Sequence, residues 1–218
     1  MNIITFHAVC SGLVALFAFS TLVSAQDLKP IQFPKPQMEG GKPLMQALKD
    51  RKSSRAFSTE KLPVQVLGNL LWAAFGINRP ESGHRTAPSA VNWQEIDIYV
   101  ATADGLYLYE AKGHTLQPVL AGDIRAATGM QPFVKDAPVE LVYVADYSRM
   151  GKGTDDQKNL YSAADTGFIS ENAYLFCASE GLATVVRGAV DKTALAKVMK
   201  LRPDQKVILA QTVGYPKK

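Results

Sequence analysis

The segment 51–57 concentrates hydrogen-bond donors, because Arg51, Lys52, Ser53 and Arg55 lie within five positions. Guanidinium groups bind phosphate oxygens through paired hydrogen bonds, an ammonium group adds a point charge, and a serine hydroxyl can complete such a site. The cluster therefore favours an anionic ligand, and phosphate is the first candidate. A short basic run is also common at a solvated helix end, so this interpretation needs support from the rest of the chain.

Three helices are expected to position this cluster. A short amphipathic helix begins near Pro43, and a second follows Pro63, with apolar residues at helical spacing until Gly76. A long helix is expected over residues 159–181 and is apolar on more than one side. Such a helix lies either at the centre of a large core or in a subunit interface.

The strand pattern predicts a mainly antiparallel sheet. Residues 96–101 and 106–109 flank the turn dipeptide Asp104-Gly105, which indicates a β-hairpin. Further strands are expected at residues 138–145, 184–186 and 207–213, and residues 78–87 are expected to form a loop. The sequence therefore predicts one α+β domain over residues 43–218, with helices flanking the sheet.

The composition fits a globular protein, since 47% of the 218 residues are hydrophobic and 20% are charged. The net charge of +4 is mild, and the basic residues are scattered without interleaved aromatic residues, so nucleic acid is not an expected partner. His84 and His114 are isolated from other metal ligands, and no metal site is expected.

The first 25 residues contain no Lys, Arg, Asp or Glu and include an apolar run at residues 13–19. This pattern is typical of a signal peptide cleaved after Ala25, and it predicts export, to the periplasm in a bacterium with two membranes. An uncleaved membrane anchor is the alternative. Residues 26–42 are expected to form an extended arm. Cleavage would remove Cys10 and leave Cys177, which lies in an apolar helical stretch and is expected to be buried.

Four separated segments resemble the FMN-dependent nitroreductase family, especially its branch that includes SagB-type peptide dehydrogenases. They occur in the family's order over almost all of the chain after Ala25. In this sequence they read Arg51-Lys52-Ser53-Ser54-Arg55-Ala56-Phe57, Arg85-Thr86-Ala87-Pro88-Ser89-Ala90-Val91-Asn92, Asp165-Thr166-Gly167 with Gly181-Leu182-Ala183-Thr184-Val185-Val186-Arg187-Gly188, and Val213-Gly214-Tyr215-Pro216-Lys217.

The resemblance implies a nitroreductase-like fold that binds FMN. Arg51, Lys52 and Ser53 would hold the phosphate and ribityl end, and Lys217 would add charge there. Arg55 would point toward the pyrimidine edge, where a cation stabilises the charge that develops on reduction. In this electrostatic sense Arg55 is the expected catalytic residue.

The resemblance also implies a homodimer whose interface contains the long helix and the flavin sites. One loop would reach the flavin of the second subunit, and a second segment would border the reactive nitrogen, with amide donors at its last two residues. The loop residues are Pro88, Ser89, Ala90 and Asn92, and the segment is Arg187, Gly188 and Ala189.

Each of these segments has a simpler structural interpretation. Pro88-Ser89 could form an ordinary turn, and Gly188 could relieve a strand end. Arg187 could be a surface charge at a strand edge, and Lys217 could belong to a frayed tail. The occurrence of all four segments in order favours the family interpretation.

The expected activity is a two-step oxidoreductase reaction. A donor such as NAD(P)H reduces the flavin, and a nitroaromatic, quinone or similar small organic acceptor then oxidises it. The alternative is an exported flavin- or ligand-binding protein that retains the fold without turnover. A serine hydrolase is less consistent with the sequence, because Ser53, Ser89 and Ser170 lack the glycine pattern of a nucleophile elbow.

Overall fold

The computed structural model describes residues 28–218. The predictions about the signal peptide, its cleavage after Ala25, the alternative anchor and Cys10 lie outside this range. Within it, no helix combines the length and the apolar character needed to cross a membrane.

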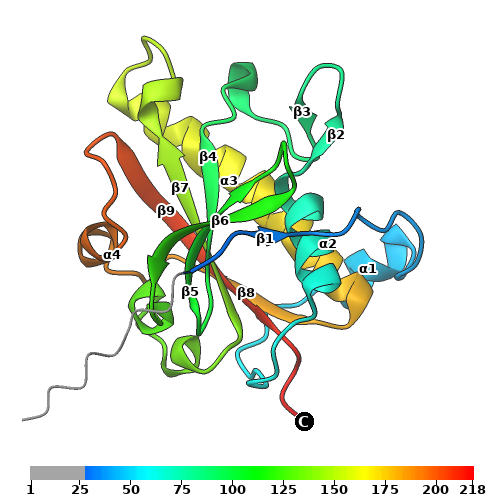
Figure 1. Ribbon diagram of the computed structural model, residues 1–218. Helices are drawn as coiled ribbons and strands as arrows, with labels where there is room; N and C mark the ends of the chain where they lie inside the picture. Colours follow the sequence, from blue (N-terminus) through cyan, green and yellow to red (C-terminus); the bar gives the residue numbers. More distant parts are fainter. Residues whose placement is uncertain (1–27) are drawn as a thin grey trace, which may run out of the picture.

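Seven strands of the described chain form one sheet, in which every neighbouring pair is antiparallel (Figure 1). The spatial order is β1-β6-β5-β4-β7-β9-β8, so β8 lies at an edge. The strands are β1 (Ile31–Gln32), β4 (Ile96–Ala101), β5 (Gly105–Glu110), β6 (Thr115–Ala121), β7 (Val139–Asp146), β8 (Ala183–Arg187) and β9 (Gln205–Gly214). The predicted hairpin is β4–β5, and the predicted α+β class with a mainly antiparallel sheet is confirmed.

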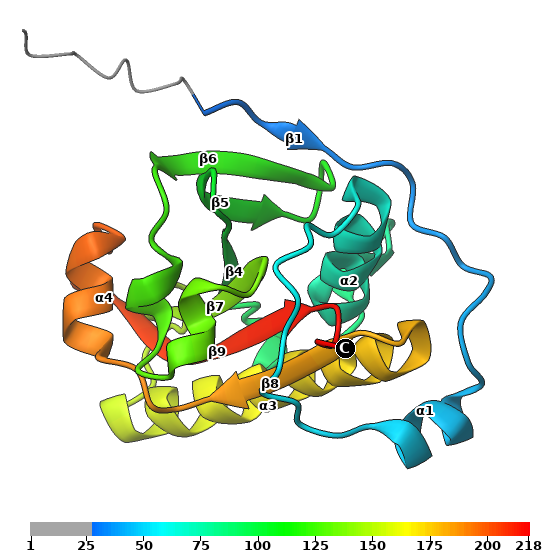
Figure 2. The ribbon, with the colours of Figure 1, turned by 90° about the horizontal axis from the view of Figure 1, so that it is seen from below.

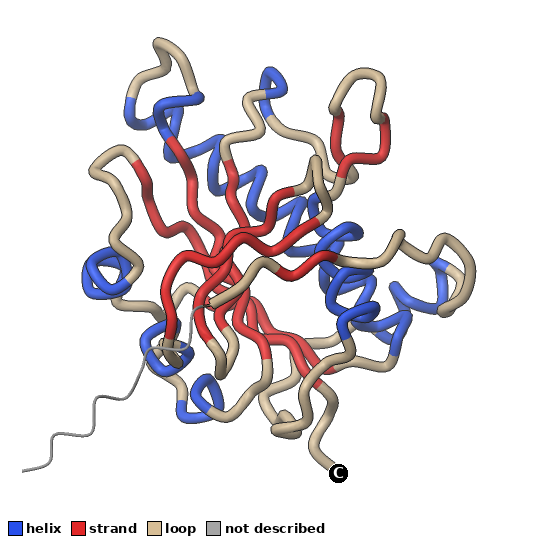
Figure 3. Tube along the Cα trace, in the orientation of Figure 1, coloured by secondary structure: helices blue, strands red, loops and turns tan. Residues whose placement is uncertain are grey.

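Helices cover both faces of the sheet (Figure 3). On one face, Ile98 and Val100 of β4 belong to the main core with α2 (Val64–Phe75) and α3 (Asp155–Glu180). On the other face, Tyr99 of β4 packs in a smaller cluster with α4 (Lys192–Val198). Successive side chains of a strand point to opposite faces, which explains this division.

The long helix α3 confirms the predicted helix and begins four residues earlier, at Asp155. Its start is fixed by a capping box between Thr154 and Gln157, and it ends at Gly181, whose φ of 71° is left-handed. Cys177 is fully buried on this helix, as the sequence predicted. The predicted helices after Pro43 and Pro63 are α1 (Leu44–Asp50) and α2.

Two predicted irregular regions are partly regular and packed. In the expected arm of residues 26–42, β1 pairs with β6, and Phe33 is only 4% exposed within the main core. The packed domain therefore begins before residue 43. The expected loop of residues 78–87 contains most of a small hairpin, β2 (Ile77–Arg79) with β3 (His84–Arg85).

Candidate cofactor site

The donor-rich segment 51–57 runs along the outer edge of β8 after leaving α1 (Figure 2). The amide of Ser54 donates to the carbonyl of Thr184 on β8 at 2.9 Å. Farther along, Phe57 forms a β-bridge with Pro216, and the amide of Lys217 donates to the carbonyl of Ala56 at 3.2 Å. Three of the four segments that the sequence singled out therefore meet at this edge.

A tyrosine on α3 holds the donor-rich segment against β8. The Tyr174 hydroxyl lies 2.8 Å from Ser53 Oγ and accepts a 2.9 Å hydrogen bond from the amide of Val186. Tyr174 is only 5% exposed, and the Arg51 guanidinium lies over its ring, 5.3 Å from the centroid. Arg51 Nε is also 3.9 Å from the Glu171 carboxylate. The site therefore places Ser53 and Arg51 on a rigid support.

Cations without a carboxylate partner surround this support. Lys52, Arg55 and Lys217 are exposed, and none forms a salt bridge with another residue in the described range. Lys52 also lines a cavity of about 530 Å³ between α1, the end of α3 and β8. Unpaired positive charge beside a fixed hydroxyl is suited to an anionic group such as a phosphate.

The edge of β8 offers a backbone donor beyond this cavity. Residues two apart on a strand present their backbone groups to the same edge, and the carbonyl of Thr184 and the amide of Val186 already bond outward there. The next amide in this series belongs to Gly188, which is exposed and donates no hydrogen bond to another described residue. Ala189 is exposed beside it, while its carbonyl accepts from the amide of Met130 at 3.2 Å. The two predicted amide donors are therefore accessible.

The side chain of Arg187 does not reach this edge, which corrects the surface-charge interpretation and excludes a cofactor contact through the guanidinium. Arg187 is 4% exposed, and its guanidinium forms an ion pair with the buried carboxylate of Glu140. It also donates to Thr212 Oγ1 at 3.1 Å and to the carbonyl of Thr128 at 2.9 Å. Its guanidinium therefore lies in the protein interior and does not face the outer edge of β8.

The loop 88–92 lies elsewhere on the molecule. The amide of Ala90 donates to Asp165 on α3 at 2.8 Å, and Gln94 bonds back to Ser89 and Asn92. Asp165 precedes Tyr174 by nine residues, a rise of about 14 Å along a helix. A single chain therefore does not bring Pro88, Ser89, Ala90 and Asn92 to the basic cluster.

Sequence reasoning missed the two side chains of α3 that organise these segments. Tyr174 lies in an apolar stretch that is typical of a core, and Asp165 belongs to a family-like segment that assigns no role to its side chain. A tyrosine and an aspartate that are 5% and 2% exposed on one long helix require hydrogen-bond partners. The sequence itself shows only an aspartate and a tyrosine within a helix that is apolar on more than one side; their burial is known from the structure.

A second carboxylate lies beside Asp165. Glu95 is fully buried, and neither of its carboxylate oxygens has a hydrogen-bond partner among residues 28–218. Burial raises the pKa of Glu95 to about 7; the adjacent Asp165 adds to this effect, while Arg149 opposes it. The pKa of Asp165 is also raised by burial, although the Ala90 amide opposes this shift.

These groups predict a pH-dependent stability. A carboxyl group whose pKa is higher in the folded state favours folding below its unfolded pKa, and this contribution is lost as the pH rises through the folded value. We expect the free energy of unfolding to fall between about pH 5 and pH 8, with Glu95 contributing at most on the order of 3 kcal/mol. Urea titrations at several pH values measure this, and Glu95→Gln should flatten the profile. Parallel profiles for the two proteins would exclude Glu95 as the cause.

The geometry defines an α+β protein with an edge whose exposed, unpaired cations are suited to a phosphate-bearing cofactor. The sequence pattern of the nitroreductase family matches residues 48–215. The chain therefore belongs to the nitroreductase family, and its general class is that of the flavin oxidoreductases.

Known proteins support this assignment. The crystal structure of a nitroreductase-type protein from Ralstonia eutropha JMP134 is 43% identical, with a TM-score of 0.84, and the match covers 95% of this chain and 97% of that one. A Methanocaldococcus jannaschii protein that carries the name of a nitroreductase is 29% identical over 162 residues, which are 70% of this chain and 81% of that protein. The NADPH:FMN oxidoreductase of Vibrio harveyi, complexed with NAD+, is 18% identical with a TM-score of 0.60, over 80% and 69% of the two chains, and shows the shared fold.

Proposed function

We propose that this protein is an FMN-dependent oxidoreductase. The observation that carries the proposal is the junction at the edge of β8, where unpaired cations, the fixed Ser53 hydroxyl and the exposed Gly188 amide lie along one strand. Thr184 and Gly188 are four residues apart, about 13 Å along a strand. This edge therefore suits an elongated molecule with a phosphate at one end and a hydrogen-bonding ring at the other.

The residues divide the binding of FMN among them. Arg51, Lys52 and Ser53 would hold the phosphate and ribityl end, Lys217 would add positive charge, and Arg55 would act at the pyrimidine edge. Bound FMN would supply the capacity to accept and return a hydride. Arg55 would favour the reduced state through its charge, and the amides of Gly188 and Ala189 would orient the reactive edge.

The donor and the acceptor are proposed at the level of chemical class. NAD(P)H or another hydride donor would reduce the protein, and a nitroaromatic, quinone or similar small organic molecule would oxidise it. If the protein is exported to the periplasm, as its first 25 residues suggest, the donor there is another reduced compound. A dehydrogenase that oxidises some reduced substrate would not need NAD(P)H in such a location.

A homodimer would complete the site. Besides its buried face, α3 carries an exposed apolar face at helical spacing, where Leu160 is 65% and Phe168 is 50% exposed. On the neighbouring helix α1, Leu44 and Met45 are 62% and 76% exposed. An apolar surface of this kind on a soluble protein suggests an interface. A second copy packed there would bring its own loop 88–92 toward the basic cluster.

The interface predicts the effect of a charge on α3. Phe168→Glu is expected to shift the protein from dimer to monomer and to weaken FMN retention, because a buried carboxylate without a partner opposes association. Sedimentation velocity gives the mass and the flavin spectrum gives occupancy. Val119→Glu, on β6 at similar exposure of 42%, is the matched control. A dimer that survives Phe168→Glu would place the interface elsewhere.

The absorption spectrum of the purified protein, with and without stoichiometric FMN, tests the proposed function. Visible flavin bands with a perturbed shape are expected, followed by bleaching when a hydride donor is added anaerobically. Flavin bands that no donor or chemical reductant changes would favour the alternative, a non-catalytic flavin- or ligand-binding protein. A colourless protein that does not bind FMN would overturn both the cofactor and the activity.

A further inference from the structure

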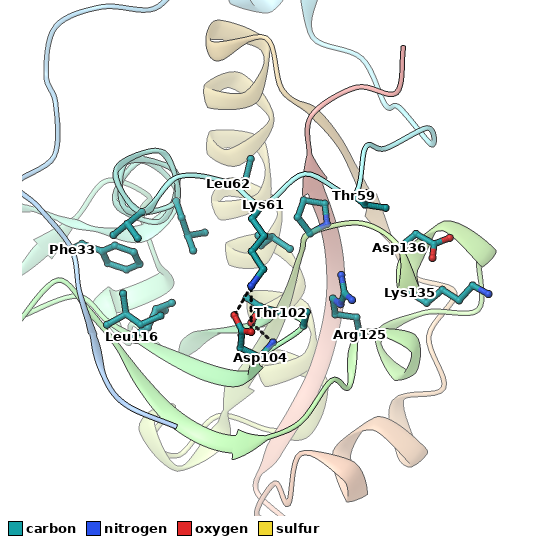
Figure 4. A pocket seen from close by; sticks show the side chains of 16 residues that line it. Phe33, Thr59, Lys61, Leu62, Thr102, Asp104, Leu116, Arg125, Lys135 and Asp136 are labelled. Carbon is teal, nitrogen blue, oxygen red and sulfur yellow. Dashed lines mark hydrogen bonds and ion pairs between the residues drawn. The ribbon is translucent and has the colours of Figure 1, made fainter. Parts of the chain in front are cut away.

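A second cavity, of about 340 Å³, opens on a different part of the fold (Figure 4). Its walls come from β1, the segment before α2, the β4–β5 turn, and the stretch between β6 and β7. None of the residues proposed to bind FMN lines it. The cavity is therefore a separate candidate site, near the lower end of the range of roughly 300–1,000 Å³ that is typical of small-molecule sites.

The floor of this cavity is formed by side chains of the main hydrophobic core. Phe33, Leu62 and Leu116 lie on one side of it, and each belongs to the main core cluster (Figure 4). Leu67 and Val139 extend the same apolar surface. A molecule bound here must present an apolar body, because a polar group against this floor would lose its hydration without gaining a partner.

The charges of the cavity lining balance one another: Lys61 and Arg125 are in ion pairs, and the two remaining charged residues, Lys135 and Asp136, are of opposite sign and adjacent in the chain. Lys61 lies 3.1 Å from the Asp104 carboxylate across the mouth, and Arg125 pairs with Asp123 at 2.7 Å. Both members of the Lys61–Asp104 pair are exposed, and a surface pair of this kind can separate at a cost of less than about 1 kcal/mol. A charged ligand would gain little net attraction from a lining whose charges balance, so the mouth favours a neutral ligand.

Arg125 provides a fixed donor in the cavity wall. Its side chain is only 13% exposed, and its Nε and Nη2 donate to Asp123 while Nη1 donates to the carbonyl of Ala137 at 2.7 Å. A guanidinium has five N–H groups, and these bonds use one on each nitrogen, so Nη1 and Nη2 each retain one. A carbonyl oxygen of a ligand is a suitable acceptor for a donor whose position is fixed in this way.

We propose that this cavity binds neutral lipophilic carbonyl compounds, such as aromatic ketones or quinones, with the apolar body on the Phe33–Leu116 floor and the carbonyl oxygen on Arg125. The proposal does not depend on FMN, because the lining residues and the proposed flavin residues are different sets. It adds a second ligand site to the protein.

The probe for this site is Prodan, a neutral naphthyl ketone whose fluorescence moves to shorter wavelength in apolar surroundings. We expect saturable binding by the purified protein, with and without bound FMN, and no displacement by excess FMN. Val64 lies at the rim of the cavity and is 48% exposed, so a larger side chain there should block the entrance. Val64→Trp should therefore abolish the blue-shifted signal. Val119→Trp adds the same ring outside the cavity and should bind Prodan normally.

The donor is tested separately. Arg125→Met should weaken Prodan binding about tenfold or more, since a hydrogen bond from a charged group is lost. Lys135→Met removes a rim cation that has no ion pair with another described residue, and it should leave the affinity unchanged. Circular dichroism verifies that each variant is folded. Absence of Prodan binding, displacement by FMN, or binding unchanged by Val64→Trp would overturn the proposal.

Discussion

Replacement of Arg187 by methionine is expected to lower the free energy of unfolding by about 3–5 kcal/mol near neutral pH. The guanidinium of Arg187 is the counter-charge of Glu140, which is fully buried on β7. Thr212 Oγ1 also donates to this carboxylate, at 2.9 Å. Without Arg187, the carboxylate would remain in the sheet with one hydroxyl donor and no cation, or it would take up a proton.

Urea titrations of the apoprotein at pH 5 and pH 8 measure this loss. The loss should be smaller at pH 5, because an unpaired buried Glu140 has a raised pKa and folds more readily when protonated. The double variant Arg187→Met with Glu140→Gln removes both charges and should be more stable than Arg187→Met alone at pH 8. A single variant that loses less than about 1 kcal/mol would show that the pair contributes little.

The elements that repeat a local pattern could be predicted from the sequence. The apolar spacing after Pro63 gives α2, the Asp104-Gly105 turn gives β4–β5, and the apolar stretch around Cys177 lies in α3 as expected. Local periodicity and turn chemistry are properties of neighbouring residues, and for that reason they can be recognised in one sequence.

The missed features depend on partners that are distant in the chain. Phe33 looked like part of a polar, proline-rich arm because its burial requires β6, more than 80 residues later. β6 itself contains Pro118, and because proline is uncommon inside strands, this segment lacks a typical strand pattern. Arg187 looked like a surface or ligand-binding charge because nothing near it in sequence indicates Glu140. Contacts between residues this far apart in the chain can be recognised only once the order of the strands in the sheet is known.

The candidate site, like the fold, could be predicted from the sequence only in part. The chemical types in segment 51–55 could be identified as donors for an anion from the sequence, and the structure places them beside β8. The role of Tyr174 as their support could not be identified from the sequence, because it requires α3 and β8 to be adjacent. The predicted loop 88–92 remains apart from this cluster within one chain, so its contribution depends on the proposed second copy.

Arg51→Ala and Arg55→Ala are expected to separate binding from reduction. Arg51 is held by Tyr174, and its loss would remove the paired hydrogen bonds that we propose to the FMN phosphate, each worth about 1.5–3 kcal/mol. We expect FMN affinity to fall on the order of a hundredfold or more, so that Arg51→Ala purifies without colour. Arg55 is exposed and makes no salt bridge with another described residue, so Arg55→Ala should fold and retain FMN.

The defect of Arg55→Ala should occur in electron transfer. Loss of a cation from the site where negative charge develops should make the flavin midpoint potential more negative and slow reduction on the order of a hundredfold. A redox titration measures the potential independently of the donor, and stopped-flow absorbance measures the rate. Lys112→Ala removes an exposed cation from the β5–β6 turn and should change neither quantity. If Arg51→Ala and Arg55→Ala both purified yellow with unchanged potentials and rates, the basic cluster would not be the flavin site, and the exposed β8 edge would need another ligand.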